Sequence, residues 1–408
     1  MPLQTIVKPV RAGSRLEIHI QGEAIPISYE WSGAAPEPRN DDYALLGALS
    51  YAMQRGGRVH VQGRVDQRLL ANAEKFSELW AAYRPDLFKQ IEVSADEDLE
   101  PRVGDPGGAY AFALSGGVDS VFSLMRNSEG ADGRTSRKPA CAFLMEWSDA
   151  RHDPAWAPAL RGRAARIAEV IGVSHLVCRT NWREFCRDFD IEHPLGILAA
   201  AHCLNGAYEG CVLAADHFHR DEVALGPWGN NHATNPLLSS SGFEAINYGG
   251  AFERLEKVRL LAHRPDLVAN LAVCTRPRSG ENCGRCEKCL RSGLELFVTS
   301  GSTLPVTQHV PSFNELAYRK PLSRSSLMFW RGIMTKWPEG RAGMSKLGLA
   351  FLIARSELQH SLVLRTLQSV ERRIGRSTRS LRGKDASLRA DRLRATAPQA
   401  GVAPLHHA

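Results

Sequence analysis

A short stretch of serine, glycine and aspartate interrupts an apolar part of the sequence at residues 115–120, which read SGGVDS. The residues before it have the pattern of a strand, and residues 121–125 after it have helical spacing. A helix N-terminus presents unpaired backbone N–H groups, and glycines let a phosphate approach them. Ser115 and Ser120 add hydroxyl donors, and Asp119 could cap the helix or help to hold Mg²⁺. The stretch predicts a phosphate-binding turn, with a turn made only for packing as the alternative.

Four of the nine cysteines lie close together in the sequence. Two CxxC steps share one cysteine, the fourth lies nine positions upstream, and Gly284 allows the chain to turn. This spacing is typical of a tetrahedral Zn²⁺ site with a structural role, because four thiolates leave no position open for water. An iron–sulfur cluster and a set of reduced cysteines are the alternatives. The expected zinc ligands are Cys274, Cys283, Cys286 and Cys289.

The six residues from Ser115 to Ser120 resemble, position by position, the Ser-Gly-Gly-x-Asp-Ser pyrophosphate loop of the ATP pyrophosphatase superfamily. The lysine of the Walker-type loop is missing. The resemblance implies cleavage of ATP between its α- and β-phosphates, with pyrophosphate held by the loop and a substrate oxygen adenylated. It implies catalytic roles for Ser115, Asp119 and Ser120. The implied nucleotide site comprises Leu114, Ser115, Gly116, Gly117, Val118, Asp119, Ser120 and Met145.

The loop and the cysteine spacing together are similar to the 7-cyano-7-deazaguanine synthase family over residues 109–300, about half of the chain. That family adenylates the carboxylate of 7-carboxy-7-deazaguanine, which ammonia then converts to an amide and a second ATP-dependent step to a nitrile. No segment has the look of a glutaminase, so the nitrogen is expected from free ammonia or a partner. Lys257 aligns with a lysine that family members carry before the zinc segment. It is expected to contact phosphate or the adenylate, with a solvated helix face as the alternative.

The resemblance weakens in the segment that should recognise the substrate. Family members have a Pro-Asp-Cys-Arg-Pro-like stretch after the fourth strand, whereas residues 214–242 read AADHFHRDEVALGPWGNNHATNPLLSSSG. This loop is expected at the carboxyl end of the sheet, and its substrate-contacting candidates are Asp216, His217, Trp228 and Asn231. The spacing of His217 and His219 also allows a metal pair, with surface placement as the alternative. The sequence is therefore expected to represent a divergent, synthase-like branch of the family. For such a branch, a nucleic-acid or protein acceptor is an alternative to a small carboxylate.

Strands and helices alternate between residues 109 and 300, which predicts an α/β fold with a parallel, doubly wound sheet and helices on both faces. Ligands of such sheets bind at the carboxyl ends of the strands. We expect a small α+β domain at 1–105, an ATP pyrophosphatase domain at 106–300 with the zinc segment at 274–291, and a helical, basic and partly flexible region at 301–408.

The formal net charge of +7 is unevenly distributed, because basic residues concentrate in 319–408. This excess predicts contact with nucleic acid or a protein acceptor, with a solvated tail as the alternative. A non-catalytic subunit that senses ATP is a third class, and the N-terminal unit could form a homodimer. No apolar run has the length of a membrane helix, the N-terminus lacks a signal-peptide core, and the odd cysteine count argues against a disulfide framework. These features predict a cytoplasmic protein without membrane contact.

Overall fold

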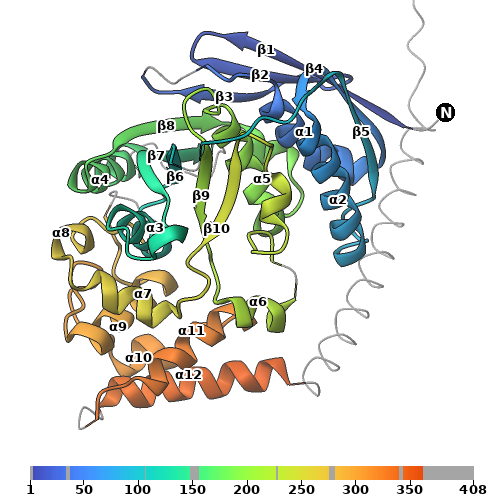
Figure 1. The fold of residues 1–408 in the computed structure, drawn as a ribbon. Helices are drawn as coiled ribbons and strands as arrows, with labels where there is room; N and C mark the ends of the chain where they lie inside the picture. The colour runs from blue at the N-terminus through green and yellow to red at the C-terminus, as the bar shows by residue number, and fades with distance from the viewer. Residues whose placement is uncertain are drawn as a thin grey trace, which may run out of the picture.

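One ten-stranded sheet runs through the molecule, in the order β10-β9-β6-β7-β8-β3-β2-β1-β4-β5 (Figure 1). The computed structural model describes residues 3–33, 37–105, 107–147, 156–226, 228–274, 281–339 and 343–361. Within these ranges the protein is α/β, with twelve α-helices and a mostly parallel sheet. The expected α/β class is therefore confirmed.

The half of the sheet that follows residue 105 is parallel throughout. Its strands are β6 (Ala109–Ala113), β7 (Lys138–Trp147), β8 (Ser174–Thr180), β9 (Gly210–Ala214) and β10 (Glu244–Tyr248). The chain runs outward from β6 to β7 and β8, then returns to place β9 on the other side of β6. The strand order therefore reverses between β6 and β9, which is where open α/β sheets form their ligand-binding crevice.

Helices cover both faces of this half, as the alternating pattern predicts. On one face lie α3 (Val118–Ser128) and α4 (Trp156–Ile171), and on the other lies α5 (Phe189–His202), packed against α1 (Asp42–Arg55). The second N-terminal helix, α2 (Gln67–Tyr83), continues the layer of α1 (Figure 1). Parallel strands buried between helices need apolar residues on both faces, which explains why the two central strands β6 (AYAFA) and β9 (GCVLA) contain no charged side chain.

The first 105 residues contribute the other five strands of the same sheet. These are β1 (Gln4–Ala12), β2 (Arg15–Ile20), β3 (Ile27–Trp31), β4 (Gly57–Asp66) and β5 (Ile91–Leu99). The sheet is not parallel throughout, because β1–β2, β2–β3 and β3–β8 pair antiparallel. The ring of Trp31 packs 5.7 Å from that of Phe143, so the two halves share one buried core across the β3–β8 junction.

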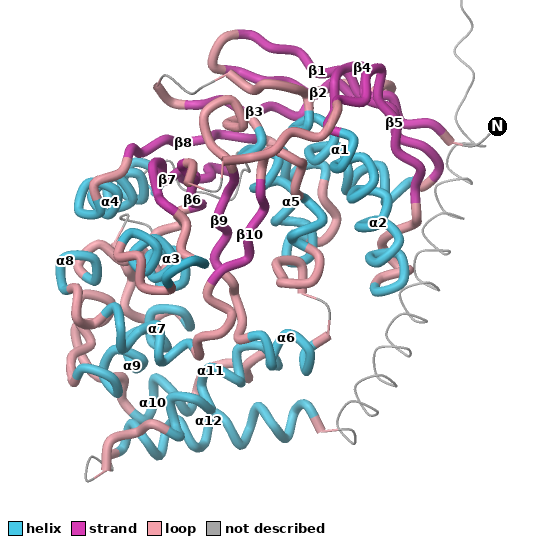
Figure 2. The backbone as a smooth tube through the Cα atoms, viewed as in Figure 1, coloured by secondary structure: helices cyan, strands magenta, loops and turns pink. Residues whose placement is uncertain are grey.

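Seven further helices of the described ranges lie next to α3, with α8 (Pro265–Val268) beside it and the others below it in the view of Figure 2. The others are α6 (His219–Leu225), α7 (Arg254–Leu261), α9 (Glu287–Ser300), α10 (Phe313–Ala317), α11 (Arg324–Thr335) and α12 (Met344–His360). Short 3-10 helices occur at Gly133–Thr135, Trp182–Phe185 and Asn235–Leu238. The C-terminal helices bury their own core around Trp330 and Leu349.

None of the helices described is both long and apolar enough to cross a membrane. The basic tail beyond residue 361 lies outside the described residues.

Candidate functional site

A cavity of about 930 Å³ opens at the carboxyl ends of β6, β7 and β9, at the point where the strand order reverses. This volume lies within the usual range of small-molecule sites. Eight of the nucleotide-site and substrate-site candidates line it: Leu114, Ser115, Gly117, Val118, Asp119, Ser120, Met145 and Asp216. The other candidates for these two sites, Gly116, Lys257, His217, Trp228 and Asn231, are not among its lining residues.

The SGGVDS turn places the start of α3 at the cavity. Gly116 has a φ of +75°, and its carbonyl accepts a hydrogen bond from the Ala272 N–H at 2.8 Å. Ser120 Oγ donates to the Gly117 carbonyl at 3.1 Å and lies 3.1 Å from Ser115 Oγ. The first intrahelical bond runs from the Val121 N–H to the Gly117 carbonyl. The N–H groups of residues 118–120 precede it and are the orphan donors of a helix N-terminus.

Asp119 lies in the first turn of α3, and the helix cap itself is Gly117. Arg254 contacts one oxygen of the Asp119 carboxylate, and Lys257 Nζ lies 3.0 Å from the other. Burial raises the pKa of Asp119, but the charges of Arg254 and Lys257 outweigh it and hold the pKa below its ordinary value. The carboxylate is therefore ionised. It is an ion-pair partner rather than a cap.

Lys257 is buried, with 2% of its side chain exposed, so the alternative of a solvated helix face is wrong for this residue. Its ammonium also donates to the Ala215 carbonyl at 3.0 Å, directly after β9. Arg254, one helical turn earlier on α7, contacts Glu295 at 3.2 Å as well as Asp119. Sequence reasoning missed Arg254, although its i, i+3 relation to Lys257 puts both cations on one helix face.

Asp216 follows β9 and faces the cavity with three polar neighbours. Trp228 Nε1 donates to its Oδ2 at 2.8 Å, Asn230 Nδ2 donates at 3.2 Å, and His193 Nε2 lies 3.6 Å away. Burial raises the pKa of Asp216, but the hydrogen bond and charge of His193 and the hydrogen bond of Trp228 bring it well below the ordinary value. The site thus holds a second ionised carboxylate.

The remaining two candidates shape the surroundings of Asp216. The ring of His217 stacks on Phe329, with centroids 5.6 Å apart, and burial lowers the pKa of this histidine. Asn231 bonds within its own loop, donating to the Trp228 carbonyl at 2.6 Å and to Thr234 Oγ1 at 2.8 Å. His217 also packs against the Trp228 ring, with centroids 5.1 Å apart, so both residues support the 228–234 loop and neither lines the cavity.

Five cationic side chains also line the cavity, which suits a ligand with several negative charges. They outnumber the three acidic residues there, Asp119, Asp216 and Glu281. The five cations are Arg163, Arg183, Arg254, Lys288 and Arg291. They come from four separate segments, α4, the 182–185 turn, α7 and α9, and only the fold brings them to one cavity.

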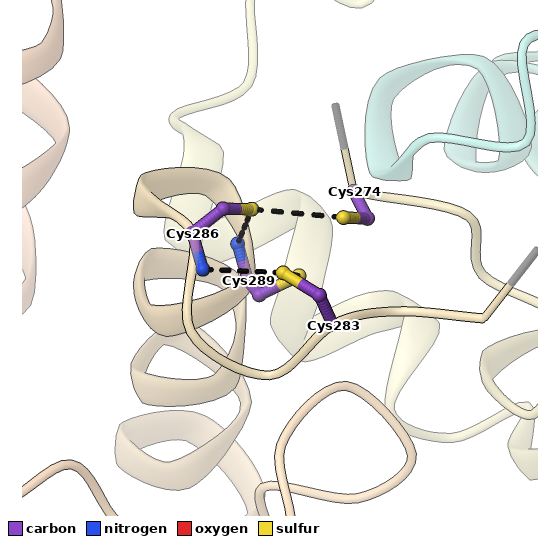
Figure 3. A group of neighbouring side chains, drawn as sticks. All are labelled: Cys274, Cys283, Cys286 and Cys289. Atoms are coloured by element: carbon purple, nitrogen blue, oxygen red, sulfur yellow. Dashed lines mark hydrogen bonds between the residues drawn. The ribbon is translucent and has the colours of Figure 1, made fainter. Parts of the chain in front are cut away.

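The four expected cysteines converge on one point (Figure 3). Cys274 Sγ lies 3.8 Å from Cys286 Sγ, and Cys283 Sγ lies 3.9 Å from Cys289 Sγ. Four thiolates bound to one Zn²⁺ at about 2.3 Å lie about 3.8 Å apart, so the cluster is compatible with zinc. A multi-iron cluster spreads its thiolates over separate irons and would hold them farther apart. Gly284 has a φ of +67°, as the expected turn requires.

The cysteine cluster forms part of the cavity wall. Cys274 lines the cavity, and Cys286 is the N-cap of α9. Asn282 Oδ1 accepts from the Val273 N–H at 3.0 Å and its amide donates to the Leu271 carbonyl at 2.9 Å, which ties the Cys274 segment to the turn. A metal ion at these thiols would therefore fix the start of the helix that carries Lys288 and Arg291.

Comparison of the chain with protein-family models, with curated proteins and with solved structures returned no match. The functional assignment therefore depends on the residues of the cavity and their geometry.

Proposed function

We propose that the protein activates a carboxylate with ATP, releasing pyrophosphate, and that ammonia or an amine then displaces AMP. The observation that best supports this is the exposure of the α3 N-terminus to a cavity that also contains ionised Asp119 and Asp216 and an excess of cations. The resemblance of residues 115–120 to pyrophosphate loops points to the same chemistry.

Each part of the cavity has a role in this proposal. The N–H groups of residues 118–120 and the Ser115 hydroxyl bind the β- and γ-phosphates, and the apolar wall at Phe143–Met145 takes the adenine. Asp119 and Asp216 fit Mg²⁺ as hard, ionised oxygen donors, and the ion would neutralise charge on the departing pyrophosphate. Arg254 and Lys257 orient the Asp119 carboxylate at the base of the loop.

The reaction needs no nucleophile from the protein. A carboxylate oxygen of the substrate bonds to the α-phosphorus as the bond to the bridging oxygen of pyrophosphate breaks. The amine nitrogen then bonds to the acyl carbon, AMP leaves with the electrons of the acyl C–O bond, and the nitrogen loses a proton. Catalysis comes from positioning and from stabilising the charge that develops on the leaving groups.

The acceptor is proposed by resemblance as an acid of the 7-carboxy-7-deazaguanine type. The 214–242 segment differs from the family pattern, so a nucleic-acid or protein acceptor is the second candidate. A subunit that binds ATP without turnover is the third. All three share the nucleotide site, and they differ in what must be added for pyrophosphate to appear.

The test measures AMP and pyrophosphate by chromatography after incubation with ATP, Mg²⁺ and ammonium, with and without 7-carboxy-7-deazaguanine. Ser115→Ala and Asp119→Asn should abolish product formation. Ser128→Ala at the other end of α3 and Asp266→Asn in an exposed ion pair with Arg264 are the matched controls and should retain it.

Products that depend on the deazaguanine acid support the first candidate. Products that appear only with RNA, DNA or a protein support the second. ATP binding without any pyrophosphate favours the sensing subunit. Product formation that survives in both Ser115→Ala and Asp119→Asn contradicts the proposal.

A further inference from the structure

A second cluster of potential metal ligands lies on α6, next to the candidate site. His219 Nδ1 is 3.4 Å from Glu222 Oε2, and His232 Nδ1, from the 228–234 loop, is 2.6 Å from the same oxygen. The potential ligand atoms of the three residues all lie within 4.8 Å of one another. His217, which the sequence paired with His219, is not part of this cluster.

The buried carboxylate of Glu222 is the feature that indicates a bound ligand. Its side chain is only 4% exposed, and within the described part of the chain its Oε1 has no hydrogen-bond partner. A buried carboxylate oxygen without a partner is unfavourable, and a bound cation removes that cost. The two imidazoles are 38% and 47% exposed, so an ion can reach the carboxylate from solvent.

The backbone holds His219 in position for this role. Its N–H donates to the Gly250 carbonyl at 2.7 Å, and a Cβ at residue 250 would lie 2.2 Å from the imidazole ring. The ring therefore packs directly on glycine backbone. Ligands bound tetrahedrally at about 2.0–2.1 Å lie about 3.4 Å apart, as His219 and Glu222 already do. His232 Nδ1 and Glu222 Oε2 are closer, at 2.6 Å, so these two atoms must move apart by less than about 1 Å for an ion to replace the proton between them.

We propose that His219, Glu222 and His232 bind one divalent transition-metal ion, separately from the four cysteines. Two imidazoles and a carboxylate favour Zn²⁺ or a similar ion over Mg²⁺ or Ca²⁺, which prefer oxygen ligands. Three protein ligands leave at least one coordination position for water or a substrate atom. The ion joins α6 to the loop whose Trp228 and Asn230 bind Asp216.

Cobalt titration of the metal-free, reduced full-length protein tests this proposal. Co²⁺ at the cysteines produces thiolate charge-transfer absorption, whereas Co²⁺ at imidazole and carboxylate produces only ligand-field bands. Two equivalents of Co²⁺ are expected in the wild type, both displaced by Zn²⁺. His232→Ala and Glu222→Gln should each lower the affinity for the second Co²⁺, which gives no charge-transfer absorption, at least about tenfold. Both variants should leave the thiolate signal unchanged.

The control is His309→Ala, which removes an exposed histidine that contacts a single glutamate, Glu315. It should bind both ions as the wild type does. Cys283→Ser should lose the thiolate signal and keep the second ion, which separates the two sites. Glu222→Gln preserves the shape of the side chain and keeps the test valid if His232→Ala folds poorly. A wild type that binds Co²⁺ only at the cysteines, or a second ion that is equally tight in both variants, overturns the proposal.

Discussion

Lys257 Nζ lies 3.0 Å from Asp119 Oδ1; the lysine side chain is 2% exposed and the aspartate side chain, at the cavity wall, is 21% exposed. Arg254 contacts the other Asp119 oxygen and also Glu295, which is 1% exposed. The two cations and two carboxylates balance, and together they connect the first turn of α3 to α7 and α9. Buried charges of this kind are tolerated only when each is paired, so the loss of any one leaves another uncompensated.

Replacing Lys257 with methionine should therefore destabilise the protein strongly. The change keeps the length of the side chain and removes its charge, which leaves Asp119 with one cation fewer and raises its pKa. We expect the free energy of unfolding to fall by about 3–5 kcal/mol, measured by urea denaturation. The matched variant is Lys75→Met, from a pair with Glu78 in which both side chains are about half exposed, and it should lose less than about 1 kcal/mol. Equal losses in the two variants would contradict this account.

Gly116→Ala should destabilise the turn at residues 115–120 for two separate reasons. The φ of +75° disfavours a side chain by about 1–2 kcal/mol, and a Cβ there would lie 3.1 Å from the Ala272 Cβ. Gly130, at the other end of α3, has a φ of +61° but nothing within 4 Å of its would-be Cβ. Gly130→Ala should therefore lose stability alone, whereas Gly116→Ala should also lose ATP affinity in calorimetric titration. Unchanged ATP affinity in Gly116→Ala would argue against the turn as the phosphate site.

Local patterns predicted the parts of the site that are contiguous in sequence. The SGGVDS turn and the CxxC steps have their geometry encoded within a few residues, by glycines at positive φ and by ligand spacing. Arg254 and Asn282 act through partners on other elements, and neither has a distinctive neighbourhood. His219 shows the limit most clearly, because the sequence suggested His217 as its partner and the fold supplies Glu222 and His232.

The same limit applies to the fold. The alternation of strands and helices between residues 109 and 300 predicted the parallel half of the sheet, because its central strands contain continuous apolar runs. β1 and β10 were missed, because QTIVKPVRA contains a proline and four polar or basic side chains, and EAINY is short and half polar. The joining of the N-terminal strands to the main sheet depends on the β3–β8 pairing, between segments almost 150 residues apart, and no local pattern encodes it.

Trp228→Phe should reduce stability in a pH-dependent way. An unperturbed aspartate has a pKa of about 3.9. The pKa of Asp216 in the folded protein is lower, which means that the ionised form of Asp216 stabilises the fold. This contribution is complete above that pH and is lost as the pH falls toward the folded-state pKa. Removing the Trp228 donor should cost about 1 kcal/mol at neutral pH, a modest value because the Asp216 side chain is 38% exposed.

Urea unfolding at a series of pH values measures the effect. The difference between wild type and Trp228→Phe should stay constant above about pH 4 and narrow below it, as the pH falls through the folded-state pKa of Asp216 in each protein, after allowance for the constant cost of the smaller ring. In an Asp216→Asn background the pH-dependent part should vanish, because that background has no carboxylate to titrate. A difference that stays constant with pH, or that persists in Asp216→Asn, would mean that Trp228 acts by packing alone.

Removing the metal from the four-cysteine site should weaken nucleotide binding, although no thiol is proposed to touch ATP. Cys286 is the N-cap of α9, and the first two turns of that helix place Lys288, Arg291 and Ser292 on the cavity wall. Without an ion no bond holds the four sulfur atoms together, so the turn at residues 283–286 loosens and these side chains lose their fixed position. We expect a chelated sample to bind ATP at least about tenfold more weakly, and re-addition of Zn²⁺ to restore binding.

Single substitutions separate this effect from general damage by the chelator. Cys283→Ser should lose the thiolate-bound ion, as measured by metal analysis, and should reproduce the weakened ATP binding. Cys186→Ser changes a half-buried cysteine outside the cluster and should keep both metal and affinity. Because His219, Glu222 and His232 contain no thiol, their proposed ion should remain in Cys283→Ser, so any loss of ATP affinity there belongs to the cysteine site. If Cys283→Ser loses the ion but binds ATP as tightly as the wild type, α9 holds its position without the metal and the proposed coupling is wrong.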